Sequence, residues 1–139
     1  MVKINLKEIV VKEIMIEQFP IISSDMHMKD VSKKIINSPY TGLPVIDSGV
    51  LVGFISEKEC LDFLFNISNL DISSAYAKDY MTKNVKSIHS QTSLEKAIVL
   101  FSKNPYHVYP IEEQGLIIGL LFRKDIIKYL YPLDSAWWK

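Results

Sequence analysis

The most constraining feature of this sequence is that it repeats itself. When Met15 is aligned with Met81, the stretches 15–65 and 81–131 match without a gap. The identical pairs are Met15/Met81, Ile22/Ile88, Ser24/Ser90, Pro39/Pro105, Tyr40/Tyr106, Pro44/Pro110, Gly49/Gly115, Gly53/Gly119, Lys58/Lys124 and Leu64/Leu130. Matched prolines and glycines weigh most, because they restrict or free the backbone at particular points. The chain therefore contains two copies of one structural unit.

Both copies show the same succession of expected elements. A short apolar strand is followed by a helix, then by two strands around a tight turn that ends in glycine, and then by a second helix. The expected strands are 19–22, 43–46 and 50–55 in the first copy, and 85–88, 109–112 and 116–121 in the second. In the second copy, Thr92 and Glu95 predict a capping box at the start of the first helix.

These patterns predict an α+β fold of two pseudo-symmetric units, each strand-helix-strand-strand-helix. One copy alone would bury too little of its sheet, so the two units should pack together through their sheets. The expected divisions are an arm 1–14 with a helix over 8–15, a first unit 15–65, a linker 66–77, a second unit 78–131 and a tail 132–139. Trp137 and Trp138 in the tail should dock on the chain itself or at a dimer interface.

Composition excludes several classes of protein. Lys and Arg balance Asp and Glu, and no long basic stretch is present, which argues against nucleic acid as a partner. The apolar runs are too short to cross a bilayer, and the N-terminus does not resemble a secretory signal. The single cysteine, Cys60, cannot form an internal disulfide, so a reducing, cytoplasmic location is expected. His27 and His89 have no Cys or His at ligand spacing, so no metal site is expected.

The repeated motifs resemble those of the cystathionine β-synthase (CBS) domain family. The segments that carry the resemblance are Val11 to Met15, Gly42 to Asp47 and Leu51 to Ser56 in the first copy, and Ala77 to Met81, Tyr109 to Ile111 and Ile117 to Leu120 in the second. The resemblance implies a tandem CBS pair, or Bateman module, with two clefts between its units and a homodimeric assembly. It also implies reversible binding of AMP, ADP, ATP or S-adenosylmethionine, which regulates a partner on a separate chain; no cofactor is required.

In the first copy, the resemblance places a ligand at Ile22, Thr41, Gly42, Ser56 and Glu59. The family's motif ends in Ser or Thr followed three residues later by Asp, and here Glu59 replaces that aspartate. A carboxylate at a helix start can accept hydrogen bonds from both ribose hydroxyls, and the helix dipole favours a phosphate. Ser56 and Glu59 also form a complete capping-box pattern, which needs no ligand.

In the second copy, the corresponding residues are Ile88, His107, Phe122, Arg123 and Asp125. Asp125 is kept, but Phe122 replaces the hydroxyl. Arg123 stands at a helix N-terminus, where the dipole disfavours a cation unless an anion lies nearby. The two isoleucines, Ile22 and Ile88, suit a strand core equally well.

Two functions follow as hypotheses. The first is a sensor module that binds an adenosyl ligand in one inter-unit cleft and signals to a separate partner. The alternative is a structural or dimerisation module with degenerate clefts, favoured by Glu59 and Phe122. Cys60 lies on an apolar helix face without a base to activate it, so the chain is not expected to be an enzyme.

Overall fold

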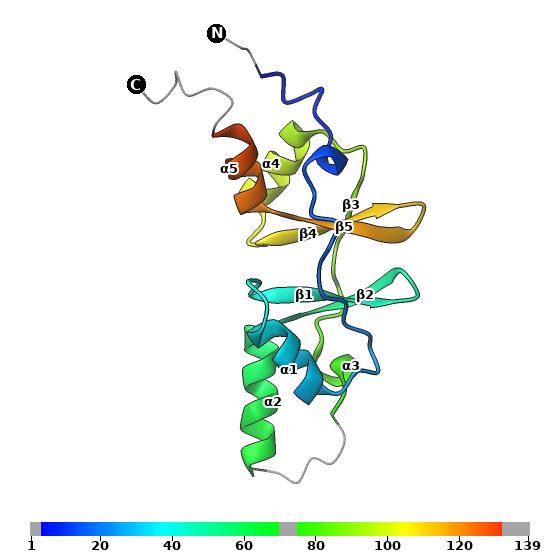
Figure 1. The fold of residues 1–139 in the computed structure, drawn as a ribbon, viewed down its shortest axis with the longest axis vertical. Coiled ribbons are helices and arrows are strands. Elements are labelled where there is room, and N and C mark those ends of the chain that lie inside the picture. The colour runs from blue at the N-terminus through cyan, green and yellow to red at the C-terminus, as the bar shows by residue number, and fades with distance from the viewer. Residues whose placement is uncertain (1–3, 70–74, 132–139) are drawn as a thin grey trace. The chain divides into compact units, whose positions relative to one another are not determined.

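The computed structural model describes residues 4–69 and 75–131. These residues form two compact units, each of which is shown in Figure 1. We call Met1–Phe19 together with Lys86–Lys139 the terminal unit, and Pro20–Val85 the central unit. Trp137 and Trp138 lie outside the described residues. Within 4–69 and 75–131, no helix is long and apolar enough to cross a membrane.

The compact units are not the same stretches of chain as the sequence copies, because the segment that leads into each copy packs with the other copy. Val11 donates its backbone N–H to the carbonyl of Thr92 over 2.9 Å. The repeat-equivalent bond runs from Ala77 to Met26 over 2.8 Å. In Figure 1 the blue N-terminal segment accordingly lies beside α4, an element of the second copy.

A second pair of equivalent contacts extends this exchange. Ile16 pairs antiparallel with Leu120, and Thr82 pairs antiparallel with Phe54. Both pairs form two backbone hydrogen bonds, of 2.8 and 2.9 Å in the first and 2.9 Å each in the second. Each hairpin therefore gains an extra paired residue on its outer strand from the other copy.

The central unit is a hairpin covered by helices. Strands β1 (Gly42–Asp47) and β2 (Val50–Ser56) pair antiparallel. The helices are α1 (Met28–Ile36), α2 (Glu57–Asn69) and the short α3 (Ala77–Tyr80). The two-residue turn places Ser48 and Gly49 at φ of 49° and 82°, as a type I′ turn requires. The hairpin prediction is confirmed.

The terminal unit repeats this plan with one more strand. Its sheet has the order β3-β4-β5, with β3 (Ile88–His89) parallel to β4 (Val108–Glu113) and β4 antiparallel to β5 (Leu116–Phe122). Helices α4 (Leu94–Lys103) and α5 (Arg123–Leu130) pack with it, as does a single 3₁₀ turn, η1 (Val11–Glu13). The helix predicted over 8–15 was wrong, because this stretch contains the 3₁₀ turn Val11–Glu13 and no α-helix.

Other local predictions were also wrong. The strand expected over 19–22 reduces to one bridge, between Ile22 and Val45, and the strand expected over 85–88 is found only at Ile88–His89. Helix α4 is capped by Ser93, whose hydroxyl accepts the N–H of Lys96 over 3.2 Å. The Thr92 capping box does not form, because the Thr92 N–H that the box would use donates to the His89 carbonyl over 2.9 Å.

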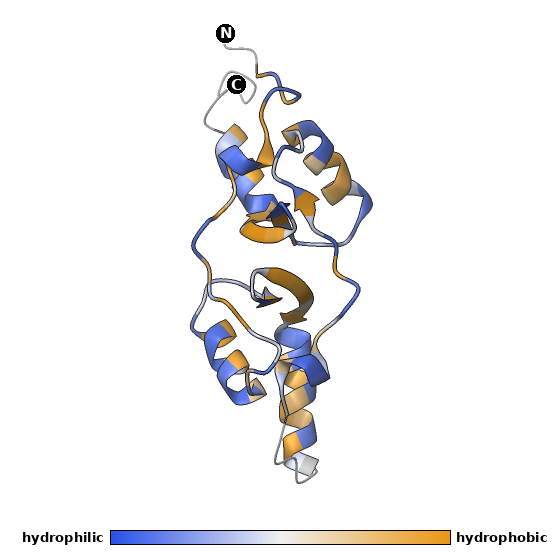
Figure 2. Cartoon of the chain, turned by 90° about the vertical axis from the view of Figure 1, so that its right-hand side faces the viewer, coloured by the Kyte–Doolittle hydropathy of each residue, from blue (hydrophilic) through white to orange (hydrophobic). Residues whose placement is uncertain are grey.

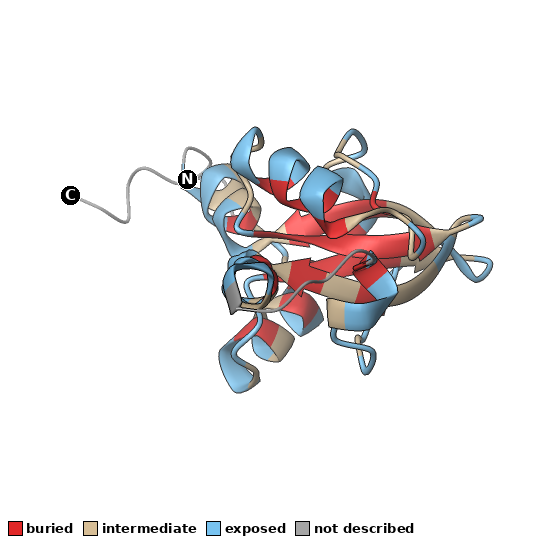
Figure 3. Ribbon diagram, turned by 90° about the horizontal axis from the view of Figure 1, so that it is seen from below, coloured by how far each residue is buried: buried red, intermediate tan, exposed pale blue. Residues whose placement is uncertain are grey.

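Apolar residues fill the side of each sheet that its helices cover. In the terminal unit, Val11 from the arm is fully buried together with Leu94, Ala97, Ile111 and Leu121. In Figure 2 the strands are mostly hydrophobic, whereas the helices alternate between hydrophobic and hydrophilic residues. Figure 3 shows the same division as buried strands and exposed outer helix faces. The arm is thus part of a core and not an appendage.

Candidate functional site

The ten residues predicted from the sequence divide cleanly between the two units. The central unit holds Ile22, Thr41, Gly42, Ser56 and Glu59, and the terminal unit holds Ile88, His107, Phe122, Arg123 and Asp125. In both units the set apart from its isoleucine gathers where the hairpin's second strand runs into a helix, whereas Ile22 pairs with Val45 in β1 and Ile88 pairs with Ile111 in β4. The Glu57 N–H donates to the Thr41 carbonyl over 2.9 Å, and the equivalent Arg123 N–H donates to the His107 carbonyl over 3.3 Å.

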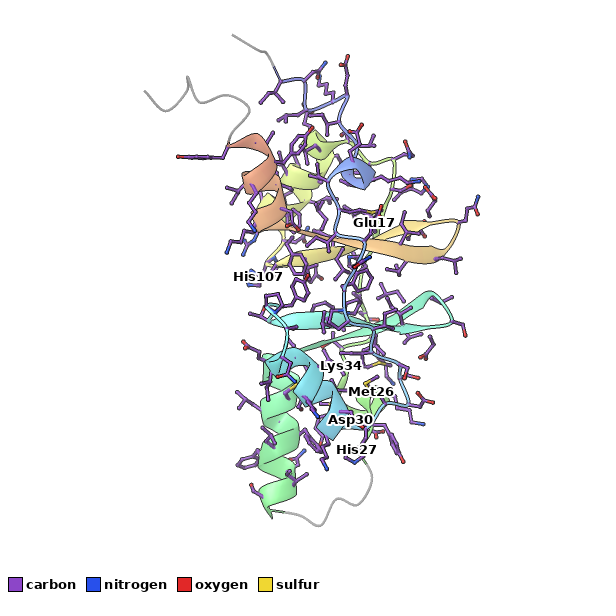
Figure 4. All side chains as sticks on the ribbon, in the orientation of Figure 1. Glu17, Met26, His27, Asp30, Lys34 and His107 are labelled. Carbon is purple, nitrogen blue, oxygen red and sulfur yellow. The ribbon has the colours of Figure 1, made fainter. Side chains whose placement is uncertain are left out.

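In the terminal unit, the site is built around the start of α5. The Asp125 carboxylate accepts the N–H of Phe122 over 2.9 Å, which turns the acidic group back toward the end of β5. The Arg123 guanidinium contacts Nδ1 of His107, and His107 is labelled beside the start of β4 in Figure 4. A carboxylate and two basic side chains are thereby collected at one helix start.

In the central unit, the equivalent carboxylate is more heavily bonded. Glu59 accepts the backbone N–H of Ser56 over 2.9 Å and also contacts the Ser56 hydroxyl. Its other oxygen accepts the hydroxyl of Thr82 over 3.1 Å. Burial raises the pKa of Glu59, but these hydrogen bonds outweigh it and hold the pKa below the ordinary 4.5. The carboxylate is therefore an anion held by its own protein.

Sequence reasoning missed Thr82, and the reason is topological. Thr82 belongs to the second copy, yet it lies beside the first copy's hairpin through its pairing with Phe54. The repeat-equivalent residue, Ile16, pairs with Leu120 in the terminal unit. No local pattern marks either residue as a neighbour of the helix start, because the segment exchange is what brings it there.

One of the two hydrogen bonds of the capping box predicted at Ser56 and Glu59 forms. The Glu59 side chain reaches back to the Ser56 N–H, as a capping box requires. The Ser56 hydroxyl donates to the carboxylate and so serves the acid instead of a helix amide. Local capping accounts for the backbone contact, whereas the hydroxyl contacts form a separate cluster.

The remaining predicted residues have mainly structural surroundings. Ile22 is fully buried and Ile88 is 8% exposed, which fits the strand-core interpretation. A β-carbon added to Gly42 would come within 2.6 Å of the Phe54 ring, so glycine permits that close approach. Cys60 is buried, and burial raises the pKa of its thiol.

Two histidines without a predicted role accept backbone N–H groups, His27 as the N-cap of α1 and His89 at the end of β3. Nδ1 of His27 accepts the N–H of Lys29 over 3.0 Å at the start of α1, and Nδ1 of His89 accepts the N–H of Gln91 over 3.1 Å. In residues 4–69 and 75–131, no three His, Cys, Asp or Glu side chains gather as a metal site would require.

Two open grooves lie apart from most of the predicted residues. One, of about 260 Å³, runs between α4 and α5 and has Arg123 on its rim. The other, of about 590 Å³, follows α1 past Met26, Asp30 and Lys34, which Figure 4 labels along that helix. The second groove contains none of the ten residues, so volume alone does not identify the site.

Comparison with known proteins places these two sites in a family context. The family model described as "CBS domain" matches residues 11–66 and 77–132. The chain is 30% identical to the methylated protein MJ0556 of Methanocaldococcus jannaschii over 91% of this chain and 76% of that one. It is 36% identical to the inosine-5'-monophosphate dehydrogenase of Nitrosopumilus maritimus, but it spans only 22% of that enzyme's length.

Solved structures show the same fold. CBSX2 in complex with AMP superposes with a TM-score of 0.79 at 24% identity, covering 91% of this chain and 98% of that one. The CBS domain pair of MJ0100, in complex with 5-methylthioadenosine and S-adenosyl-L-methionine, gives 0.73 at 21% identity, covering 88% and 96%.

Proposed function

Because this chain belongs to the CBS domain family, we propose that it is a regulatory module that reversibly binds an adenosyl ligand at the start of α5. The ligand class is AMP, ADP, ATP or S-adenosylmethionine. The module acts in the cytoplasm, carries out no catalysis, and signals to a separate protein through a change in conformation or assembly. The residues assigned to the ligand are Ile88, His107, Phe122, Arg123 and Asp125.

The single observation that carries this proposal is the difference between two equivalent carboxylates. In the central unit, hydroxyls at positions 56 and 82 both contact the carboxylate of Glu59. In the terminal unit, the same two positions are Phe122 and Ile16, which have no hydroxyl to donate. The two hydroxyls of a ribose would supply to Asp125 what Ser56 and Thr82 supply to Glu59.

The basic pair beside Asp125 suits the other end of such a ligand. The Arg123 backbone opens α5, so its guanidinium and the helix N-terminus both favour an anion there. His107 turns its Nδ1 toward the Arg123 guanidinium, which leaves Nε2–H of the imidazole as a donor for the same anion. A phosphate, or the carboxylate of S-adenosylmethionine, would offset the electrostatic repulsion between the Arg123 guanidinium and the positive N-terminal end of α5.

The solved relatives support the ligand class at the level of the fold. AMP is bound by CBSX2, and 5-methylthioadenosine and S-adenosylmethionine are bound by the MJ0100 pair. All three ligands contain an adenosyl group. Carrying this class to the present chain rests on the family membership and on Asp125, since both identities are below 25%.

Assembly into a homodimer is part of the proposal. On α2, Leu61 is 66% exposed, and its repeat partner Ile127 on α5 is 62% exposed. An apolar residue left on the same face of both equivalent helices is costly for a lone chain and suits contact with a second copy. Ligand binding can change this assembly only if the two states differ in affinity for the ligand.

The alternative function, a structural interaction module with non-binding clefts, is favoured by the central unit. There the carboxylate is satisfied by the chain itself. The second predicted site, at Ile22, Thr41, Gly42, Ser56 and Glu59, stays a prediction.

Thermal unfolding with and without ligand tests the proposed function. A ligand present at about a hundredfold above its Kd should stabilise the protein by about 2.7 kcal/mol, a shift of several degrees. We expect this shift with one of AMP, ADP, ATP or S-adenosylmethionine, and not with guanine nucleotides. Asp125→Asn should abolish it, whereas Asp62→Asn, on the exposed surface of α2, should retain it. Absence of any shift with all four compounds would favour the structural alternative.

A further inference from the structure

We infer that the central unit's carboxylate is occupied by the chain's own hydroxyls, so that the chain takes up one adenosyl ligand and not two. This inference rests on the proposed function for its ligand, but its structural part can be tested without one. The cluster of Ser56, Glu59 and Thr82, which we call the hydroxyl cluster, takes the place of a bound diol. Its role is to fasten the segment around Thr82 to the start of α2 within the central unit.

The geometry of the hydroxyl cluster uses both oxygens of the acid. One Glu59 oxygen accepts the Ser56 N–H at 2.9 Å and contacts the Ser56 hydroxyl, and the other accepts the Thr82 hydroxyl at 3.1 Å. A ribose diol needs these same two oxygens as acceptors. A ligand would therefore have to replace hydrogen bonds that already exist, with little net gain.

Thr82 is fixed in place by more than its side chain. Its N–H and carbonyl both bond to Phe54, each over 2.9 Å. The neighbouring Met81 lies against Gly53 so closely that a β-carbon on the glycine would come within 2.5 Å of the sulfur. The hydroxyl is thus presented to Glu59 by a rigid backbone, which gives it the advantage of an intramolecular donor over a free ligand.

The direction of the Glu59 pKa agrees with this arrangement. Although burial opposes ionisation, the hydroxyl and amide donors keep the pKa below its ordinary value. A carboxylate stabilised as an anion by its own protein gains correspondingly less from an added donor. Beside Asp125, the residues equivalent to Ser56 and Thr82 are apolar and supply no such hydroxyl donors.

The same cluster explains the residue choice that departs from the family pattern. Glutamate is one methylene longer than aspartate, and here that length lets the acid reach its own N-cap residue and the exchanged segment together. In the terminal unit, Asp125 reaches only as far as the N–H of its own N-cap residue, Phe122, in the contact the structure shows. The longer Glu59 side chain therefore suits hydrogen bonds within the protein, and the shorter Asp125 side chain suits hydrogen bonds to a ligand.

Calorimetric titration with the adenosyl compound that shifts the unfolding midpoint tests the stoichiometry. We expect one equivalent per chain, loss of binding in Asp125→Asn, and binding retained in Glu59→Gln. Two equivalents per chain would overturn the inference while leaving the proposed function intact. Loss of binding in Glu59→Gln with binding retained in Asp125→Asn would overturn both the inference and the proposed site at the start of α5. If no adenosyl compound binds, the proposed function fails and the structural part is decided by the next experiment.

A double-mutant cycle in the absence of ligand tests whether the hydrogen bond from Thr82 to Glu59 stabilises the central unit. We expect Thr82→Val and Glu59→Ala each to lower the unfolding midpoint. The double variant should be about as stable as Glu59→Ala alone, because that variant has already lost the hydrogen bond from Thr82. The matched control is Ile16→Val with Asp125→Ala in the terminal unit, whose effects should add. Additive effects in the Thr82 and Glu59 cycle would refute this stabilising hydrogen bond, whatever the calorimetric titration shows.

Discussion

The side chain of Met15 lies directly over Gly119. A β-carbon added to this glycine would come within 2.5 Å of the Met15 sulfur, 2.9 Å of its Cγ and 3.0 Å of the Ile16 carbonyl. Met81 lies over Gly53 in the same way, with its sulfur at 2.5 Å. These two contacts mark the places where each copy's leading segment crosses the other copy's hairpin.

Gly119→Ala should therefore destabilise the protein. A backbone carbonyl is among the close atoms, so moving the methionine alone cannot relieve the overlap, and we expect a loss of about 1–3 kcal/mol. Chemical denaturation measures it. Combining Gly119→Ala with Met15→Ala should recover part of the loss that the two single changes would add up to. A double variant as unstable as that sum would contradict the contact.

Acid should weaken the attachment of the arm. The hydrogen bond from Ser90, with a further one from Lys12 at 3.0 Å, holds the pKa of Glu113 below its ordinary 4.5. The pKa of Asp47 is likewise lowered by Ser24, its repeat-equivalent partner. Because the folded pKa values are depressed, this stability is present above the ordinary values and is lost as the pH falls through the folded ones.

We expect the unfolding midpoint to be nearly constant from pH 7 to 5 and to fall below about pH 4.5. Glu113→Gln should lower the midpoint at pH 7 and flatten the acid limb. Since the Lys12 and Glu113 side chains are 45% and 35% exposed, the effect of that ion pair should be small and should decline with salt. An acid limb unchanged by Glu113→Gln would exclude this explanation.

The start of α4 provides a test of the corrected capping residue. Ser93 accepts the Lys96 N–H, so Ser93→Ala should cost about 1 kcal/mol. Thr92→Ala is the matched control, because the arm uses only the backbone carbonyl of Thr92. It should change stability by a few tenths of a kcal/mol. A larger effect at Thr92 than at Ser93 would restore the capping box that the sequence predicted.

Cys60 should react slowly with thiol reagents in the folded protein. It is 8% exposed, and burial raises the pKa of its thiol, so little reactive thiolate is available. Labelling with an aromatic disulfide reagent, followed by absorbance, should be slow until denaturant is added and then reach one thiol per chain. Rapid labelling of folded protein would show that the thiol is accessible and activated.

The proposed homodimer predicts a change of mass in solution. Replacing Leu61 and Ile127 together by Glu should convert dimer to monomer, because a contact that buries apolar side chains would then bury unpaired charges. Analytical ultracentrifugation measures the assembly. Gln114→Glu, in the exposed hairpin turn, is the control and should leave the mass unchanged. A monomeric parent protein would refute the dimer outright.

Much of the local structure could be predicted from the sequence. The gapless repeat with matched Pro and Gly residues indicated two equivalent units, and the hairpins formed where Gly49 and Gly115 had placed their turns. The α+β class and the CBS resemblance are confirmed. These features depend on periodicity and on backbone torsions, which neighbouring residues along the chain largely decide.

The tertiary structure decided which copy completes which sheet. A repeat alignment identifies equivalent residues, but it does not tell which copy the segment around Val11 packs against. In the structure, Val11 bonds to Thr92 of the second copy. Only the folded chain shows the exchange, and with it the burial of Val11 and the approach of Thr82 to Glu59. The sequence alone could therefore name Glu59 and Asp125 as equivalent acids. Their different hydroxyl neighbours depend on a contact between segments far apart in the chain.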